Sequence, residues 1–186
     1  MDSDTNIRSV EQLVDHVNHG NKVKYIYFWG HRKPKAGVSK TCFSQWYESS
    51  FTVNGETYKT AEHYMMAEKA RLFGDMDTFK KIIAAKNPGE AKQLGRSVAG
   101  FNEKTWIENR FDIVVQANLG KFSQNEKLKE YLLKTGNRVL VEASPVDTIW
   151  GVGLAADHEA ITNPNLWKGL NLLGFALMEV RSRLAC

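Results

Sequence analysis

Two carboxylic acids, Glu62 and Asp147, stand in settings where a carboxylate could do chemistry. Glu62 follows Thr60 by two residues, and Thr60 can cap a helix whose first turn then carries Glu62. Free backbone N–H groups and the positive end of the helix favour the ionised form of a carboxylate there. A Glu in the first turn is also an ordinary capping residue, so the local pattern predicts either a helix cap or a catalytic group.

A lysine lies on the same predicted helical face as Glu62. Lys69 comes about two helical turns later, with Met65 and Met66 between the two charged residues. An acid and a base could therefore share one wall of a cavity.

Asp147 belongs to residues 142–153, a stretch without a repeating pattern. Its glycines, Gly151 and Gly153, permit backbone conformations that other residues rarely adopt, and Trp150 offers a flat aromatic surface. Irregular loops of this kind commonly carry function. We therefore expect Asp147, Trp150 and Gly151 to belong to a site.

Aromatic and polar residues are mixed in a second region. Trp29 follows a predicted strand, and Gln45 and Trp46 lie farther along the same loop-rich segment. Clustered aromatic residues either fill a core or stack on a flat ligand such as a base, and the sequence leaves both possibilities open.

Two arginines could grip a phosphate. Arg96 follows Gly95, and a glycine inside a predicted helix indicates close approach by a neighbour or a ligand. Trp106 and Arg110 lie one helical turn apart. They could form a buried cation–π pair, or Trp106 could stack on a ligand while Arg110 binds its phosphate, and the sequence leaves both possibilities open.

These residue types suit the cleavage of a glycosidic bond. Breaking a C–N bond at a sugar develops positive charge on the anomeric carbon, which a carboxylate can stabilise while it, or a partner, activates water. An aromatic side chain would hold the base and the cations would hold a phosphate.

Other chemistry finds no support in the sequence. The five histidines have no metal-binding spacing, and neither a phosphate-binding loop nor a dinucleotide fingerprint occurs. Cys42 and Cys186 are too few for a disulfide framework. The sequence therefore supports neither metal chemistry nor nucleotide-triphosphate chemistry.

The elements that must position these residues are mostly helical. Asn54–Gly55 predicts a tight hairpin just before the helix of Glu62. The apolar spacing predicts a mainly helical single domain with a few short strands. Helices are expected at about residues 9–19, 87–98, 102–117 and 170–184, one beginning at 60, one from 75 or 77 to 83, and one that follows a capping box at 123–126 and ends at 136. Strands are expected at 23–28, 51–58 and 138–142.

The whole composition is that of an ordinary globular protein. We expect a helical N-terminal extension at residues 1–22 and one domain at residues 23–186. The N-terminus lacks the basic start and apolar core of a signal peptide, and no run is long enough to cross a membrane, which together predict a cytoplasmic protein. The net charge of +4, densest at residues 31–35, suits phosphorylated ligands and weak nucleic-acid contact equally.

Several spaced motifs resemble one known family. Residues 60–64, 94–96 and 141–153, together with Trp106 and the segment at 171–174, are similar to the YbiA-like N-glycosidases, also called the NADAR family. The resemblance runs from about residue 25 to residue 184.

The resemblance implies a mainly helical enzyme without a cofactor. It implies hydrolysis of the N-glycosidic bond in phosphorylated ribosylamino-pyrimidine intermediates of riboflavin biosynthesis, and related members remove ADP-ribose from guanine, which would make nucleic acid a partner. A non-catalytic module that binds ADP-ribose or a nucleotide is the third possibility. The active-site positions of the family correspond to Glu62, Trp106 and Asp147.

One departure concerns substrate preference. Many short members read Ser-Asn-Phe where this chain has Ser44-Gln45-Trp46, which lengthens the amide side chain by one methylene and enlarges the aromatic surface. The residues expected to bind the substrate are Trp29, Gln45, Trp46, Lys69, Arg96, Arg110, Trp150 and Gly151.

Overall fold

The computed structural model describes residues 6–186, which form two compact units. One unit contains residues up to 44 and residues 127–186, and the other contains residues 45–126. Helices dominate both units, which confirms the mainly helical class predicted from the sequence. No helix within residues 6–186 combines the length and the apolar character needed to cross a membrane.

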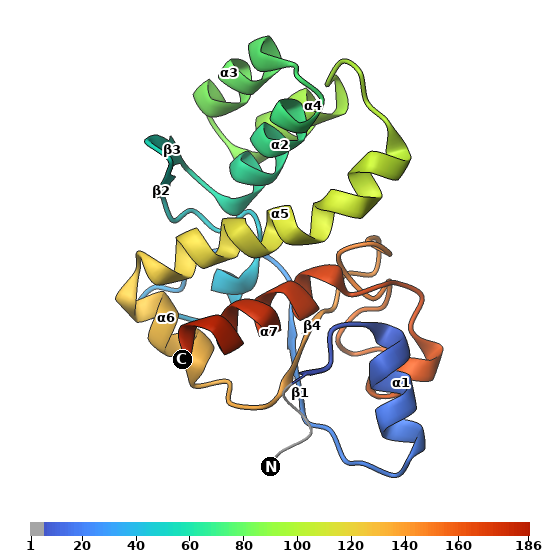
Figure 1. Cartoon of the computed structure of the whole chain (residues 1–186). Coiled ribbons are helices and arrows are strands. Elements are labelled where there is room, and N and C mark those ends of the chain that lie inside the picture. The colour runs from blue at the N-terminus through green and yellow to red at the C-terminus, as the bar shows by residue number, and fades with distance from the viewer. Residues whose placement is uncertain (1–5) are drawn as a thin grey trace. The chain divides into compact units, whose positions relative to one another are not determined.

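The unit of residues 45–126 is built around α2 (Ala61–Leu72), which contacts three other helices (Figure 1). Residues 61–67 of α2 are all buried, although the sequence does not have the one-sided apolar stripe of a surface helix. The other elements are the strands β2 (Phe51–Val53) and β3 (Glu56–Tyr58) and the helices α3 (Met76–Ala84), α4 (Pro88–Arg96) and α5 (Glu103–Ser123).

Local signals place the ends of these elements. Asn54 and Gly55 both have positive φ angles, 51° and 85°, as a type I′ hairpin turn requires. The side chains of Thr60, Asp75, Asn87 and Asn102 each accept a hydrogen bond from a backbone N–H of the helix that follows. The predicted first turns of these four helices are therefore confirmed.

Close packing explains the glycine inside α4. A Cβ at Gly95 would overlap the Met66 sulfur and lie 2.9 Å from Met66 Cγ. The glycine thus lets α4 approach α2, and its neighbour Arg96 is exposed at the end of the helix.

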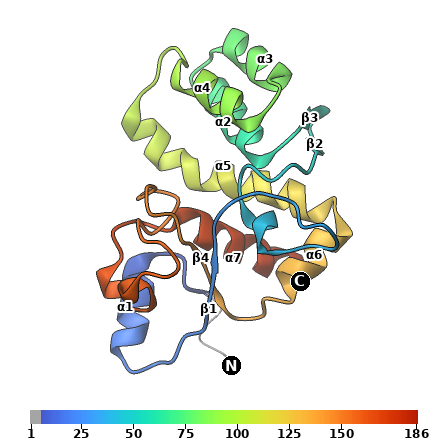
Figure 2. The same cartoon turned by 180° about the vertical axis from the view of Figure 1, so that it is seen from behind.

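In the other unit, two parallel strands carry the core. β1 (Tyr25–Phe28) pairs with β4 (Val139–Glu142), with Tyr25 opposite Val139 and Phe28 opposite Glu142. Helix α7 (Leu172–Leu184) packs on β4, and Figure 2 shows both strands next to it from behind. The unit also contains α1 (Val10–Asn18), α6 (Glu126–Leu133) and the single-turn helices η2 (Lys40–Phe43), η3 (Glu159–Thr162) and η4 (Pro164–Leu166).

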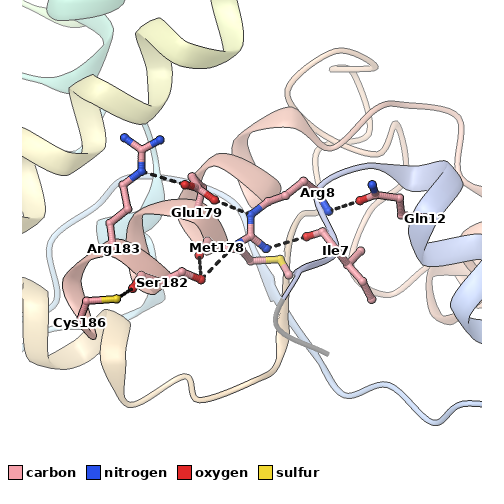
Figure 3. Close-up of polar contacts among 8 residues, drawn as sticks. All are labelled: Ile7, Arg8, Gln12, Met178, Glu179, Ser182, Arg183 and Cys186. Carbon is pink, nitrogen blue, oxygen red and sulfur yellow. Dashed lines mark hydrogen bonds and ion pairs between the residues drawn. The ribbon is translucent and has the colours of Figure 1, made fainter. Parts of the chain in front are cut away.

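The segment before β1 is tied to α7 and to η4. Arg8 donates hydrogen bonds of 2.9 Å to Glu179 Oε2 and to Ser182 Oγ (Figure 3). Asn18 and Asn165 exchange two hydrogen bonds, of 3.2 and 3.1 Å. Of the predicted extension at residues 1–22, residues 1–5 lie outside the described part of the chain, and the rest forms part of this unit.

The capping box predicted at residues 123–126 is wrong. Helix α5 continues through Ser123, whose hydroxyl donates to the Gly120 carbonyl at 3.4 Å, and Gln124 closes the helix. A Cβ at Gly120 would lie 2.7 Å from the Phe51 ring, so the glycine serves the packing of α5 on β2.

Candidate active site

Glu62 lies in the first turn of α2 and is only 4% exposed. Its backbone N–H donates to the Gln45 carbonyl at 3.0 Å, which fastens this turn to the segment before the hairpin. Thr60 Oγ1 accepts a hydrogen bond from the His63 N–H at 3.2 Å and so caps the helix without using Glu62. The carboxylate of Glu62 is therefore not needed as the N-cap.

His63 stabilises the same helix start through its ring. Its Nε2 lies 3.1 Å from the Ala85 carbonyl oxygen, and its Nδ1 lies 2.8 Å from Thr60 Oγ1. A carbonyl can only accept, so Nε2 carries the proton, and Nδ1 accepts from the Thr60 hydroxyl. Burial lowers the pKa of His63, which fits this neutral tautomer.

Lys69 stands in the electrostatic field of Glu62 and Arg96. Burial lowers the pKa of Lys69, the positive charge of Arg96 lowers it further, and Glu62 acts in the opposite direction. Lys69 thus interacts electrostatically with Glu62 of the same helix and with Arg96 of α4, which adds a second cation near it.

Two aromatic rings flank the Lys69 ammonium group. Its Nζ lies 4.6 Å from the centre of the Phe101 ring and 5.5 Å from the Trp106 ring. Trp106 therefore faces the Lys69 cation. The sequence had suggested Arg110 as the cation beside Trp106, and Arg110 is half-buried one turn farther along α5.

Sequence reasoning missed Phe101, although a local signal was available. Phe101 precedes the N-cap Asn102, at the position where an apolar residue often packs against the start of a helix. The side chain is 47% exposed and also contacts the Phe73 ring, so it extends the aromatic surface around Lys69.

Gln45 and Trp46 border this region from the segment before the hairpin. Gln45 is 6% exposed, and its side-chain oxygen accepts a hydrogen bond from Asn118 Nδ2 at 2.8 Å. Trp46 is half-buried, with Lys92 Nζ 6.0 Å from its ring centre. Asn118 and Lys92 are further residues that the sequence did not single out, because each lies on a helix without a distinctive motif.

Asp147 has a structural task in the loop of residues 142–153. Its Oδ1 accepts hydrogen bonds from the backbone N–H groups of Ile149 and Trp150, at 2.9 and 2.8 Å, and its own N–H donates to Ser144 Oγ at 3.2 Å. Asp147 is half-buried. The carboxylate thus sets the loop conformation through one oxygen.

Gly151 makes the same loop compact. A Cβ at this position would lie 2.8 Å from the Glu142 carbonyl oxygen and 3.0 Å from that of Asp147. The Gly151 carbonyl also accepts from the Asn171 N–H at 3.1 Å, directly before α7. In the structure, Gly151 is required in this loop because neighbouring backbone atoms lie too close to leave room for a side chain.

The structure groups the predicted residues within each unit. In residues 45–126 it brings Glu62, Lys69, Arg96 and Trp106 together on α2, α4 and α5. In the other unit Asp147, Trp150 and Gly151 share one loop, and Trp29 follows β1 with its side chain 58% exposed. The basic residues 31–33 and 35 are all exposed.

No metal centre emerges from the described residues, among which no three His, Cys, Asp or Glu side chains gather as ligands. The groups that do gather around α2 are a buried carboxylate, two cations and two aromatic surfaces. Such a set can stabilise positive charge at a sugar carbon and hold an anion at a distance from it.

Comparison with known proteins places the chain in a family. The family model "NADAR domain" matches residues 27–185. The N-glycosidase R617 of Acanthamoeba polyphaga mimivirus is 49% identical over 163 residues, which cover 85% of this chain and 95% of that protein. The riboflavin biosynthesis protein PYRR of Zea mays is 36% identical over 140 residues, 70% of this chain but only 21% of that protein.

A solved structure agrees with the sequence relatives. The NMR structure of the Escherichia coli protein YbiA matches with a TM-score of 0.70 at 29% identity, and the match covers 89% of this chain and 87% of YbiA. YbiA of that organism is itself named an N-glycosidase. The chain therefore belongs to the NADAR family and is an enzyme of the N-glycosidase type.

Proposed function

We propose that this protein hydrolyses the N-glycosidic bond of phosphorylated ribosylamino-pyrimidines, the intermediates of riboflavin biosynthesis, and releases ribose 5-phosphate. The observation that carries the proposal is the buried Glu62 at the start of α2, with Lys69, Arg96 and Trp106 around it. The similarity to a riboflavin biosynthesis protein of maize supports the substrate class.

The reaction replaces a C–N bond by a C–O bond. Water adds to the anomeric carbon, the bond to the exocyclic nitrogen breaks, and that nitrogen takes up a proton to leave as the free aminopyrimidine. Positive charge develops on the sugar during the bond cleavage. We assign to Glu62 the stabilisation of that charge or the activation of the water, since Thr60 already serves as the helix cap.

The other residues hold the substrate. Trp106 offers a planar surface for the pyrimidine, and Lys69 and Arg96 hold the phosphate, because a compact ammonium group and a forked guanidinium group both bind phosphate oxygens. Asp147 has a second, catalytic role in this proposal. Its Oδ1 accepts the hydrogen bonds that order the loop, and its Oδ2 acts on the substrate.

Incubation with each of the two ribosylamino-pyrimidine phosphates tests the proposal. Purified protein is expected to release ribose 5-phosphate, measured by coupled assay or mass spectrometry, and Glu62→Gln is expected to release almost none. Glu68→Gln is the matched control, because Glu68 lies on the same helix and pairs with Arg71 on the surface. No release by the unmodified protein at high concentration would refute the substrate assignment.

The exposed basic loop at residues 31–35 favours a second candidate, the removal of ADP-ribose from guanine in nucleic acid. This activity uses the same C–N chemistry on a larger substrate. Loss of the modification from ADP-ribosylated DNA, weakened by Arg32→Ala and Lys33→Ala, would support it. Tight binding of ADP-ribose without turnover of either substrate would instead indicate a non-catalytic module.

A further inference from the structure

The amide of Asn118 fixes the orientation of the Gln45 side-chain amide. Both side chains are buried, Gln45 at 6% exposure and Asn118 at 0%, on the segment before the hairpin and on α5. The pair is joined by the hydrogen bond of 2.8 Å from Asn118 Nδ2 to Gln45 Oε1. The main chain of Gln45 in turn accepts from the Glu62 N–H at 3.0 Å, so this pair adjoins the first turn of α2.

A backbone carbonyl determines which way both amides point. Asn118 Nδ2 also lies 2.9 Å from the Val114 carbonyl oxygen, which can only accept. The Asn118 atom at that position must therefore be the nitrogen. Because this same nitrogen meets Gln45, the Gln45 atom facing it must be the oxygen, and the Gln45 NH₂ group is turned to the opposite side.

That NH₂ group is a donor without a use inside the protein. Gln45 Nε2 is buried and has no hydrogen-bond acceptor among the described residues, and at the other end of the pair Asn118 Oδ1 is likewise buried without a donor. A buried amide donor that lacks an acceptor is costly, and such exceptions call for an explanation. A ligand that brings an acceptor, such as a ring carbonyl oxygen, would satisfy it.

We propose that Asn118 is a positioning residue for substrate specificity: it locks the Gln45 amide so that Nε2 donates to an acceptor on the pyrimidine leaving group. The proposal rests on the function proposed above. Without the lock, the amide can turn by 180° and present its oxygen, which repels a carbonyl. The lock therefore distinguishes pyrimidines with an acceptor at this position from those with a donor.

Two variants separate this role from a structural one. Asn118→Ala removes the lock, and Gln45→Glu keeps an oxygen for Asn118 while replacing the donor by an acceptor. Asn109→Ala is the matched control, because Asn109 Nδ2 makes the same kind of bond on α5, to the Thr105 carbonyl at 2.8 Å, without a partner like Gln45. Asn118→Asp tests the orientation, since it removes the NH₂ group that donates to Gln45 Oε1, and the oxygen that replaces it would accept from the Gln45 amide and turn that amide around.

The experiment measures KM and kcat for both ribosylamino-pyrimidine phosphates together with the melting temperature. Asn118→Ala, Gln45→Glu and Asn118→Asp are each expected to raise KM on the order of tenfold, the loss of about one hydrogen bond, with a smaller change in kcat, while Asn109→Ala leaves KM unchanged. Lower melting temperatures with unchanged KM in all three variants would overturn the proposal and leave a structural pair.

A second measurement does not depend on turnover. Free 5,6-diaminouracil is added to labelled protein, and the side-chain NH₂ signals of Gln45 are followed by NMR. A shift on binding that disappears in Asn118→Ala supports the lock even if neither phosphate is a substrate. Binding of 5,6-diaminouracil that leaves those signals in place, or no binding at all, would overturn it. Absence of turnover by the unmodified protein would contradict only the proposed substrate.

Discussion

Lys69 is the residue that joins the charged and aromatic parts of the candidate site. Its ammonium group faces Phe101 and Trp106, and its pKa responds to Glu62 and Arg96. The two rings hold the Lys69 ammonium group near the Arg96 guanidinium group, and the two positive charges repel each other. An anionic ligand bound between them would relieve this repulsion.

Removing either phosphate-binding cation is expected to weaken binding more than chemistry. In Lys69→Ala and Arg96→Ala, KM should rise about tenfold or more while kcat changes less, because a phosphate remote from the breaking bond is held alike in the ground and transition states. Lys80→Ala, an exposed lysine of α3, is the control. A fall in kcat with an unchanged KM would show that Lys69 or Arg96 acts on the reacting bond.

His63 gives the protein a pH dependence of stability. Its folded-state pKa lies below the ordinary 6.5, so the unfolded chain takes up a proton at a higher pH than the folded chain does. Stability is therefore full above about pH 6.5 and falls as the pH decreases below that value. Protonation would also prevent Nδ1 from accepting the Thr60 hydroxyl.

Chemical denaturation at pH 7.5 and pH 5 measures this dependence. The unmodified protein is expected to lose more unfolding free energy between the two pH values than His63→Gln loses. Equal losses in the two proteins would show that other groups cause the acid sensitivity.

At the scale of elements, local signals predicted helix starts better than packing partners. Thr60, Asp75 and Asn102 were recognisable as caps because a cap acts within three residues of itself. The Ser123 prediction was wrong because a local capping pattern does not show that α5 continues through Ser123, with Gly120 packed against Phe51. Phe101 and Asn118 were missed because their importance comes from distant residues, Lys69 and Gln45.

Two glycines set how closely helices approach their neighbours, and they should differ in cost. A Cβ at Gly174 would overlap the Leu140 carbonyl oxygen, which belongs to the fixed backbone of β4, whereas a Cβ at Gly95 meets the flexible Met66 side chain. Gly95→Ala is expected to destabilise by about 1–3 kcal/mol, and Gly174→Ala by more.

Thermal and urea unfolding of both variants will rank them. Adding Met66→Ala to Gly95→Ala should relieve the steric clash and so restore part of the lost unfolding free energy. The double variant should still be less stable than the unmodified protein, because the shorter side chain leaves a cavity. A Gly174→Ala protein as stable as the unmodified one would contradict the close packing of α7 on β4.

At the scale of the whole molecule, the chain forms two units whose membership is not apparent from the sequence. The apolar pattern predicted the strands at residues 23–28 and 138–142, but it did not identify them as partners, since more than a hundred residues separate Tyr25 from Val139. Within residues 45–126, by contrast, the hairpin and α2 follow one another closely, and most of that part of the candidate site was predicted.

The N-terminal segment belongs to the fold although the family match begins only at residue 27. Ile7 and Leu13 are buried, and Arg8 and Asn18 bind α7 and η4. Deleting residues 1–22 is expected to cost about 3 kcal/mol or more of unfolding free energy, from the lost burial of two apolar side chains. Leu13→Ala alone should give part of this loss, and a deletion variant with an unchanged melting temperature would show that the extension is dispensable.

The proposed catalysis depends on the negative charge of Glu62. Glu62→Gln keeps the size of the side chain, and Thr60 still caps the helix, so the variant should lose no more than about 1 kcal/mol of stability. If Glu62 acts on the anomeric centre, kcat for the ribosylamino-pyrimidine phosphates should fall by roughly 100-fold or more. Asp147→Asn keeps the oxygen that orders the loop and is the companion variant.

The most direct test is therefore kcat of Glu62→Gln, Asp147→Asn and the double variant, measured beside their melting temperatures. If Glu62 and Asp147 act as a unit, all three variants melt normally, each single variant loses at least about 100-fold in kcat, and the double variant is hardly worse than either. A Glu62→Gln protein that melts normally and keeps a near-normal kcat would contradict the proposed catalysis.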